Sequence, residues 1–454
     1  MLYTYTFNDL IAIFVVKSLM MQRKALGFLN KWKDNQSKKP LIIQGARQVG
    51  KTWLMQEFGK SKYNRVAYFN FETTRELHGL FTQGIQINNI MVGLSILAGF
   101  QINEEYSTLI IFDEVQACPQ AITSLKYFNE QKPSLSIMAA GSLLGVAMHK
   151  AVSFPVGKVE FLNLYPLDFH EFLDAMGQAE LLSVLQSENR ELIRVFHNPL
   201  IELLKQYFCI GGMPEVVYEF VQNKDFKQAR RLQNNILLAY ENDFSKHAPV
   251  EQLPRIRLVW QSVIGQLAKE NSKFVYNVLR SGARAKDFDM AINWLKDAGL
   301  IQKVTRITKS AWPITSYANW SDFKIYMNDV GLLGAKGDLS SEIILKGNDL
   351  FMEFKGTLTE QFVLQQLIAA GVQAYYWKPE NALSEVDFVI QLENDIIPIE
   401  VKAGKNVRSR SLHVYHEKYK PKLCVRTSLM EYQDQDWMKN IPLYGFLAWV
   451  ESMK

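Results

Sequence analysis

Four short runs of apolar residues, each bounded by polar or turn-forming residues, lie in the first third of the chain. They cover residues 40–44, 66–71, 109–112 and 135–140. Strands that are buried on both faces read as continuous apolar runs, and parallel pairing is the usual reason for such burial. The pattern therefore predicts a parallel sheet with helices on both faces, and the first of these helices opens with Trp53.

Helical periodicity dominates the middle of the chain. Residues 161–249 are mostly helical by pattern, with one break where Gly211 and Gly212 precede Met-Pro. Adjacent glycines and a proline interrupt a helix because they supply unusual backbone angles and lack a backbone donor. A helical segment is therefore expected to follow the predicted parallel sheet.

A helix–turn–helix order follows, with a strand behind it. Helices are expected around residues 258–260 and 274–276, another over 287–298, and a strand over 300–304. This order is typical of a winged helix, which often reads DNA. The basic residues near the turn that could meet phosphates are Arg280, Arg284 and Lys286. The segment lacks a dense basic face, which favours a winged helix that packs between neighbouring domains, or a plain amphipathic α+β domain, over DNA contact.

An eight-residue motif follows the first predicted strand and precedes the first predicted helix. It fits the pattern G-x-x-x-x-G-K-[ST], whose backbone N–H groups surround phosphate oxygens at a helix N-terminus. We expect Lys51 to reach the β- and γ-phosphates of ATP and Thr52 to offer its hydroxyl to Mg²⁺. The residues expected to bind the nucleotide are Gly45, Ala46, Arg47, Gln48, Val49, Gly50, Lys51 and Thr52.

An acidic pair ends the third apolar run. Asp113 and Glu114 stand at the carboxyl end of this strand, where open α/β sheets place their ligand-binding groups. We expect Asp113 to bind Mg²⁺ together with Thr52, and Glu114 to orient or deprotonate the attacking water. Glu114 and Lys51 are thus the expected catalytic residues. Ser142, behind the fourth run, is either a nucleotide-binding γ-phosphate sensor or an ordinary turn residue.

Two carboxylates and a lysine lie on consecutive predicted strands near the C-terminus. Asp387 lies on the first strand, and Glu400 and Lys402 lie on the second, where residues two apart face the same side. Such a pair of acids can bind a divalent cation, in addition to the Mg²⁺ at the loop, and the lysine can position water. Glu360 in a preceding helix completes a D…E-x-K nuclease pattern. The alternative is a remnant of that fold without catalysis.

Charge, cysteine content and the N-terminal apolar run indicate which partners and which cellular location to expect. Lys and Arg number 51 against 46 Asp and Glu, and the resulting charge of +5 does not by itself argue for nucleic acid. The 3 cysteines are far apart, so a reducing, cytoplasmic location is expected. The apolar run 10–16 is too short for a membrane span, and Lys17 interrupts it, so no membrane is expected as a partner. It is either a first amphipathic helix or sequence that precedes the true start, at Met20 or Met21.

The motifs together resemble a family of bacterial and archaeal AAA-type ATPases that carry a central winged helix and a C-terminal PD-(D/E)XK nuclease-like domain of unknown function. The resemblance extends from about Gln22 to the C-terminus. It implies a ring-forming ATPase fold. The family often has an arginine where this chain has Lys158; if that arginine is a finger, a lysine lacks its planar fork and hydrolysis is expected to be slow. The segments that carry the resemblance are 45–52, 113–116, 141–142, 165–169, 211–215, 385–388 and 399–402.

The expected fold class is α/β, with a P-loop NTPase core, a helical and winged-helix region, and a C-terminal α/β nuclease-like domain. The chain has 454 residues, more than the roughly 250–300 at which one core stops growing, so several domains are expected. We predict an N-terminal helical segment (1–35), an ATPase core (36–160), a helical lid or linker (161–250), a winged-helix-like domain (251–335) and a nuclease-like domain (336–454).

The expected function is Mg²⁺-dependent ATP hydrolysis that rearranges the winged-helix and nuclease-like regions. Two alternatives stay open: a metal-dependent DNA nuclease regulated by ATP, and a non-catalytic signalling switch that binds ATP and presents a surface to proteins. Besides ATP, the partners that these alternatives involve are DNA, another protein or further copies of the chain.

Overall fold

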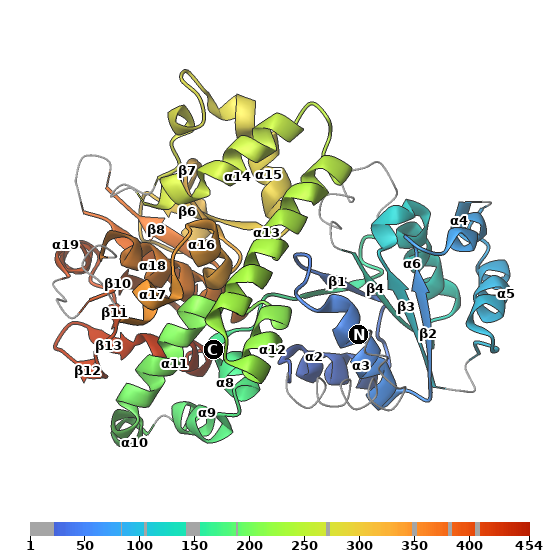
Figure 1. Cartoon of the computed structure of the whole chain (residues 1–454), viewed down its shortest axis with the longest axis horizontal. Coiled ribbons are helices and arrows are strands. Elements are labelled where there is room, and N and C mark those ends of the chain that lie inside the picture. Colours follow the sequence, from blue (N-terminus) through green and yellow to red (C-terminus); the bar gives the residue numbers. More distant parts are fainter. Residues whose placement is uncertain are drawn as a thin grey trace, which may run out of the picture. The chain divides into compact units, whose positions relative to one another are not determined.

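The computed structural model describes residues 22–82, 84–103, 107–141, 155–187, 189–268, 273–346, 352–379, 384–404 and 409–454. The chain groups into two compact units (Figure 1). The N-terminal unit contains Met1–Tyr165 and Asp297–Gly299, and the C-terminal unit contains Pro166–Lys296 and Leu300–Lys454. Residues 1–21 lie outside the described part, so the apolar run at 10–16 stays a prediction.

A parallel sheet forms the centre of the N-terminal unit. Its strand order is β2-β3-β4-β1-β5, and every pairing is parallel. The predicted strands are confirmed, whereas β5 lies at the start of the segment that the pattern assigned to helices. The strands are β1 (Leu41–Gln44), β2 (Arg65–Asn70), β3 (Thr108–Asp113), β4 (Ser136–Ala140) and β5 (Glu160–Asn163).

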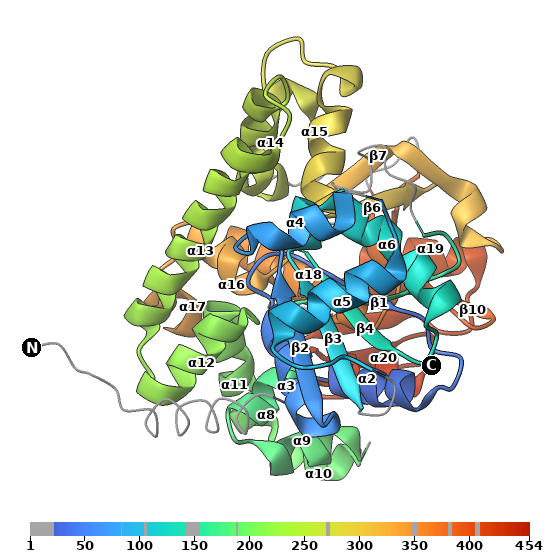
Figure 2. The same ribbon diagram turned by 90° about the vertical axis from the view of Figure 1, so that its right-hand side faces the viewer.

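Helices cover both faces of this sheet, as the pattern predicted. Along β3, Ile110 and Phe112 belong to the core on one face, with residues of α4 (Arg75–Thr82), α5 (Ile87–Ala98) and α6 (Pro119–Gln131). These three helices lie in front of the sheet in Figure 2. Helix α3 (Lys51–Lys62) packs on the other face, where Gly59 leaves room for the side chain of Leu109. Helix α2 (Ala25–Asp34) lies beside α3.

Helices open the C-terminal unit, in agreement with the predicted helical segment. No helix among the described residues is both long and apolar enough to cross a bilayer. The helices up to the first strand of this unit are α8 (Phe169–Ala175), α9 (Ala179–Gln186), α10 (Arg190–Val195), α11 (His197–Ile210), α12 (Pro214–Asn223), α13 (Phe226–His247), α14 (Leu253–Leu267) and α15 (Ala285–Asp297).

One predicted helix of the winged-helix pattern is wrong. Residues 274–276 do not begin an α-helix, and the segment contains only a single 3₁₀ turn at Tyr276–Val278. The side-chain amide of Gln266 pairs with both backbone groups of Val275, whose N–H donates to Oε1 at 2.9 Å and whose carbonyl accepts from Nε2 at 3.0 Å. Phe274 N–H donates to Phe323 O at 2.8 Å. The backbone is thus satisfied in an extended form, and a helix would break these bonds.

The predicted wing is part of a larger sheet. Strands β6 (Ile301–Ile307) and β7 (Ala318–Met327) form an antiparallel hairpin, but β6 also pairs in parallel with β8 (Ala374–Trp377). The sheet has eight strands in the order β12-β13-β11-β10-β9-β8-β6-β7. The segments predicted as separate winged-helix and nuclease-like domains therefore share one sheet and one unit. Its other strands are β9 (Val386–Leu392), β10 (Asp395–Val401), β11 (Val425–Ser428), β12 (Gln433–Asp434) and β13 (Lys439–Pro442).

Helix α18 (Met352–Ala369) connects the large sheet to the helical part of the unit through buried glutamines. The amide of Gln361 pairs with both backbone groups of Met327 at the end of β7, at 2.9 and 2.8 Å. Gln366 Oε1 accepts from the N–H of Phe169, the first residue of α8, at 2.9 Å. Buried backbone groups need such partners, so α18 joins β7 and α8 by satisfying them. The remaining helices are α16 (Val330–Lys336), α17 (Ser341–Lys346), α19 (Arg410–Tyr419) and α20 (Phe446–Ser452).

Two segments that the sequence singled out, 165–169 and 211–215, meet in this unit. Leu167 N–H donates to Gly212 O at 2.7 Å, and a side chain at Gly212 would collide with the backbone of Leu167. Gly212 N–H donates at 2.6 Å to Asp329, which is fully buried and also accepts from Leu332 N–H at 2.9 Å and Gln365 Nε2 at 3.1 Å. Asp329 therefore connects the glycine turn, the start of α16 and helix α18.

We expect the substitution Asp329→Ala to lower the free energy of opening of α16 and the 211–214 turn by about 3 kcal/mol, because several buried donors lose their acceptor. Hydrogen exchange of these amides measures that free energy. Asp225→Ala is the matched control, since Asp225 is an exposed N-cap whose loss costs only about 1 kcal/mol. Equal losses in the two variants would contradict the role of Asp329.

Candidate functional site

The motif at residues 45–52 lies where the sequence places it, between β1 and α3. Gly45 has φ +147, and a side chain there would collide with the carbonyl of Leu164. Gly50 has φ +93 at the N-cap of α3, and Gln48 has φ +65. Positive φ angles interspersed among other residues turn backbone N–H groups towards one concave side, the geometry that binds anions. The loop can therefore surround a phosphate at the N-terminus of α3.

Lys51 is buried in this loop. Its ammonium group donates to the carbonyls of Gly45 and Ala46, at 2.8 and 2.7 Å. Burial lowers the pKa of Lys51 to about 8, although the charges of Glu114 and Asp113 raise it. The lysine is thus held inside the loop by weak neutral acceptors, which phosphate oxygens could replace.

Thr52 and Asp113 meet at the carboxyl edge of the sheet. Thr52 Oγ1 donates to Asp113 Oδ2 at 2.7 Å, and the hydroxyl of Tyr68 donates to the same oxygen at 2.8 Å. Burial raises the pKa of Tyr68 to about 12, and Asp113 contributes to the rise, so the phenol stays a donor. A hydroxyl and a carboxylate are oxygen ligands of the kind Mg²⁺ takes beside nucleotide phosphates, so these residues fit that ion. The pattern analysis missed Tyr68, because a tyrosine within an apolar strand gives no functional signal.

Glu114 follows Asp113 in an unusual backbone conformation. Its φ is +52, in the left-handed region that non-glycine residues seldom adopt. Its N–H donates to Asp113 Oδ1 at 3.1 Å, and the side-chain amide of Gln116 donates to Glu114 Oε2. The turn thus directs successive carboxylates to the same edge of the sheet. A strained residue beside a ligand site is a frequent feature of catalytic centres.

Arg23 supports the loop from outside the motif. Its guanidinium donates to Val49 O at 2.9 Å and to Tyr165 O at 2.7 Å, and its side chain is buried. Val49 belongs to the nucleotide loop, and Tyr165 is the last residue before the chain leaves the N-terminal unit. Sequence reasoning missed Arg23, because a single arginine before the first helix matches no motif.

Lys158 and Ser142 were also considered for the nucleotide site, and the structure describes only Lys158. Lys158, at the position where the resembling family often has arginine, forms an ion pair with Glu130 of α6 at 3.1 Å. Both side chains are partly exposed, so the pair contributes little to stability. Ser142 lies outside the described residues, so its role as a sensor stays a prediction.

The residues of the predicted nuclease pattern do come together, in the C-terminal unit. Strands β9 and β10 form the predicted hairpin, and Asp387 Oδ2 accepts from the N–H of Val401 across it at 2.7 Å. Lys402 contacts Glu400 Oε1 at 2.6 Å, which agrees with the expectation that both side chains point together. Glu360 approaches from the middle of α18, which begins upstream of the predicted helix start.

A lysine that the sequence analysis did not select lies among these carboxylates. Lys324, on β7, is 1% exposed, and its Nζ lies 2.5 Å from Glu385 Oε1 and 3.9 Å from Glu360 Oε2. Tyr326, two residues along the same strand, donates to Glu360 Oε2 at 2.8 Å. Lys324 and Tyr326 alternate with apolar residues, a pattern that usually marks a solvated strand face. Here α18 covers that face of the strand, and the sequence pattern does not predict this contact.

The charges of this cluster depend on burial. Burial, together with the negative charges of Glu400 and Glu360, raises the pKa of Asp387 well above its usual range. Burial alone would lower the pKa of Lys324, but Glu360, Glu385 and Asp387 raise it above its ordinary value. The neighbouring carboxylates thus favour the charged form of Lys324, whereas burial and those carboxylates disfavour the charged form of Asp387.

A second divalent cation does not fit the cluster as it stands. Among the described residues, no three His, Cys, Asp or Glu side chains are grouped so that they could hold a metal ion. The expectation of a metal at Asp387 and Glu400 thus has no support here.

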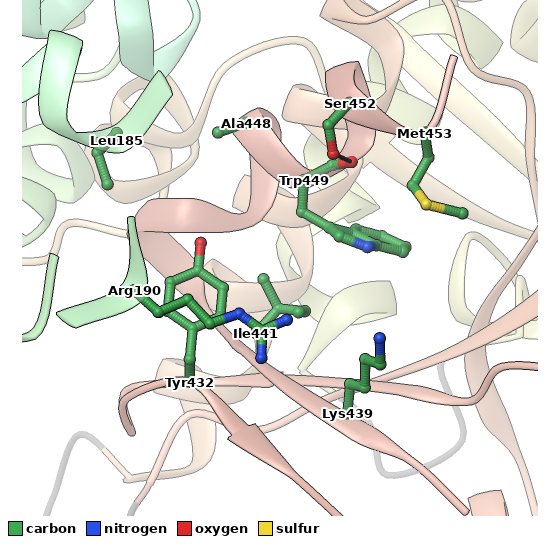
Figure 3. Close-up of a pocket in the computed structure, with 9 residues that line it drawn as sticks. All are labelled: Leu185, Arg190, Tyr432, Lys439, Ile441, Ala448, Trp449, Ser452 and Met453. Carbon is green, nitrogen blue, oxygen red and sulfur yellow. Dashed lines mark hydrogen bonds between the residues drawn. The ribbon is translucent and has the colours of Figure 1, made fainter. Parts of the chain in front are cut away.

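A third candidate is a hollow of about 180 Å³ in the C-terminal unit. Figure 3 shows Arg190 above the ring of Tyr432, with Lys439 and Trp449 on the other side of the hollow. The guanidinium lies 5.4 Å from that ring and pairs with Asp434 at 2.6 Å. The lining contains neither a carboxylate nor an imidazole, so it offers no metal site.

A strand, a loop of the phosphate-binding type, a helix and an Asp–Glu pair at the edge of a parallel sheet define a P-loop NTPase. Comparison with protein families agrees. Residues 37–173 match the AAA domain family, residues 201–342 match the domain of unknown function DUF8612, and residues 355–446 match the domain of unknown function DUF4143. The chain therefore carries an AAA-type ATPase domain, a class that uses ATP and Mg²⁺. No family that matches is described as a winged helix or a nuclease, so those parts of the resemblance stay predictions.

Similar solved structures share only a loose likeness with this chain. A Walker-type ATPase of Pyrococcus abyssi has 13% identity and a TM-score of 0.44, with 70% of this chain and 96% of that chain covered. The ORC1 protein of Aeropyrum pernix in complex with DNA has 10% identity and a TM-score of 0.27, with 71% and 92% covered. The RuvB Holliday junction branch migration motor of Thermotoga maritima has 12% identity and a TM-score of 0.29, with 62% and 89% covered. No curated protein matches the chain.

We expect Arg23→Met to weaken ATP binding by about tenfold, because the Val49 carbonyl loses a charge-assisted bond that holds the loop. Arg23→Lys should fall between this variant and the wild type, since a lysine keeps the charge but cannot span two carbonyls. Titration calorimetry with ATP measures the affinity. Unchanged affinity in Arg23→Met would remove Arg23 from the support of the loop.

Proposed function

We propose that this protein hydrolyses ATP in a Mg²⁺-dependent reaction and that its nucleotide state rearranges the C-terminal unit. The observation that carries the proposal is the arrangement at the edge of the parallel sheet, where Lys51, Thr52 and Asp113 converge. Thr52 and Asp113 share a hydrogen bond of 2.7 Å, and Lys51 lies buried in the loop before them. The site thus combines a phosphate-binding loop, the positive charge of Lys51 and two oxygen ligands for Mg²⁺.

The geometry of the site supports the following roles. Backbone N–H groups of residues 45–52 bind the phosphates of ATP, and Lys51 exchanges the carbonyls of Gly45 and Ala46 for phosphate oxygens. Thr52 and Asp113 hold Mg²⁺, which neutralises negative charge on the transferred phosphoryl group when it is bound. Glu114 orients the attacking water and accepts its proton. The position of Glu114 directly after Asp113, in a left-handed backbone conformation, supports this role.

The proposed coupling uses the bonds of Arg23. This side chain connects Val49 of the loop with Tyr165, after which the chain enters the C-terminal unit. The exit strand β5 also pairs with β1, which carries the loop, and Leu164 N–H donates to Gln44 O at 2.7 Å. A shift of the loop on nucleotide binding would therefore reach Leu164 and Tyr165 through short hydrogen bonds.

The wider setting belongs to the same proposal. Cys118, Cys209 and Cys424 are free thiols, which supports a reducing, cytoplasmic location. DNA, another protein and further copies of this chain are the partners that we propose to test for the rearranged unit. No observation on the described residues favours the metal-dependent nuclease, since the cluster in the C-terminal unit lacks a group of three metal ligands.

Replacement of Glu114 tests the hydrolytic part. We expect Glu114→Gln to keep ATP affinity and to reduce steady-state hydrolysis by about 10²–10⁴-fold, because an amide cannot accept the proton of water. Glu72→Gln is the control, since Glu72 is an exposed carboxylate just after the neighbouring strand β2. Phosphate release measures turnover. Turnover that is equal in Glu114→Gln and wild type would exclude Glu114 from the mechanism.

Hydrogen exchange tests the coupling. In the Glu114→Gln variant, which holds ATP without turnover, we expect ATP to change the exchange of amides both in the loop and in the residues that follow Tyr165. Addition of Arg23→Met should confine the change to the N-terminal unit at saturating ATP, because the connection between Val49 and Tyr165 is lost. A response of the C-terminal unit that survives this substitution would contradict the proposed route.

A further inference from the structure

The position of Lys324 is unusual for a lysine. It lies on β7, an outer strand of the eight-stranded sheet, yet its side chain is 1% exposed. Its ammonium group lies 2.5 Å from Glu385 Oε1, 3.9 Å from Glu360 Oε2 and 5.1 Å from the ring centroid of Tyr376. A buried ammonium group is tolerated only where opposite charges and polar groups replace water, so these contacts are what keep it inside.

Most carboxylate oxygens of the cluster already face nitrogen donors. Glu385 Oε1 contacts Lys324, and Glu385 Oε2 lies 3.4 Å from Lys378. Asp387 Oδ2 accepts from the backbone N–H of Val401. A divalent cation would need several of these oxygens around one point at about 2.0–2.6 Å. The carboxylates are thus arranged around ammonium and amide groups and not around an empty centre.

One oxygen of the cluster differs from the others. Glu400 Oε1 contacts Lys402 at 2.6 Å, but Glu400 Oε2 is buried and has no hydrogen-bond partner among the described residues. Val401, the residue after Glu400, donates its N–H to Asp387. Asp387 lies two residues after Glu385, the partner of Lys324, so Lys324 and Glu400 belong to the same cluster. A cation near this oxygen would be favoured by the carboxylates and opposed by the fixed positive charge of Lys324.

We infer that the ammonium group of Lys324 takes the place of a divalent cation in this cluster, which makes it a metal-free ion-pair core. The charges support this assignment, because the lysines Lys324, Lys378 and Lys402 stand against the carboxylates Glu360, Glu385, Asp387 and Glu400. Lys324 thereby connects β7 to α18 and to the start of β9. The inference goes beyond the proposed ATPase function and does not rest on it.

Binding of Mn²⁺ to nucleotide-free protein tests the inference, with free Mn²⁺ measured by electron paramagnetic resonance. Comparison of wild type with Glu400→Gln isolates this cluster from the nucleotide site. We expect identical binding curves. The variant Lys324→Met should bind one Mn²⁺ that wild type does not bind, and the double variant Lys324→Met/Glu400→Gln should lose this additional ion. Lys378→Met is the matched control, because Lys378 contacts the same Glu385 from a more exposed position and should gain nothing.

Two results would overturn the inference. Wild-type protein that binds Mn²⁺ at a site lost in Glu400→Gln would show that the cluster accepts a metal beside Lys324. A folded Lys324→Met variant without any gain would show that the ammonium is not what excludes the cation. If Lys324→Met does not fold, Lys324→Gln, which keeps polar contacts in the same space, replaces it. The comparison of wild type with Glu400→Gln needs neither lysine variant.

Discussion

The structure depends on one requirement, namely that polar groups removed from water must find partners inside the protein. In the N-terminal unit the requirement is met at the edge of the sheet, where Thr52 pairs with Asp113 and Arg23 pairs with two carbonyls. In the C-terminal unit it is met by the glutamines of α18 and by Asp329. Each of these groups satisfies backbone or side chains from distant parts of the chain. Buried polar bonds thus fix the arrangement within each unit in addition to apolar packing.

Sequence reasoning succeeded where the chemistry is local. The loop at 45–52 and the acidic pair after β3 depend on neighbours within a few residues, and the continuous apolar runs of the first sheet follow from burial on both faces. The backbone at Val275 was predicted as helix but is extended, because the side chain of Gln266, nine residues earlier, forms hydrogen bonds with it. Helix propensities are assigned residue by residue and do not include a hydrogen bond from a side chain nine residues away. The role of Arg23 depends in the same way on a partner far along the chain.

The second sheet shows a different limit of sequence reasoning. Its hairpin β9–β10 and the placement of Asp387, Glu400 and Lys402 follow from strand alternation. The connection of β6 to β8 was not predictable, because parallel pairing across a long insertion leaves no local trace. The burial of Lys324 depends on distant residues in the same way, since Glu360 of α18 and Glu385 contact it. The sequence pattern thus predicted where the carboxylates lie, whereas the lysine that neutralises them, Lys324, is identified only in the folded structure.

The two bonds of Arg23 have a consequence for where the ATPase domain begins. The match to the AAA domain family starts at residue 37, after α2, and the predicted core ended at residue 160. The bonds of Arg23 cross both limits, because the guanidinium precedes the first and Tyr165 follows the second. A fragment cut at those positions would leave the Val49 carbonyl without its cationic partner. The contacts that hold the nucleotide loop therefore begin before the start of the family match, at Arg23.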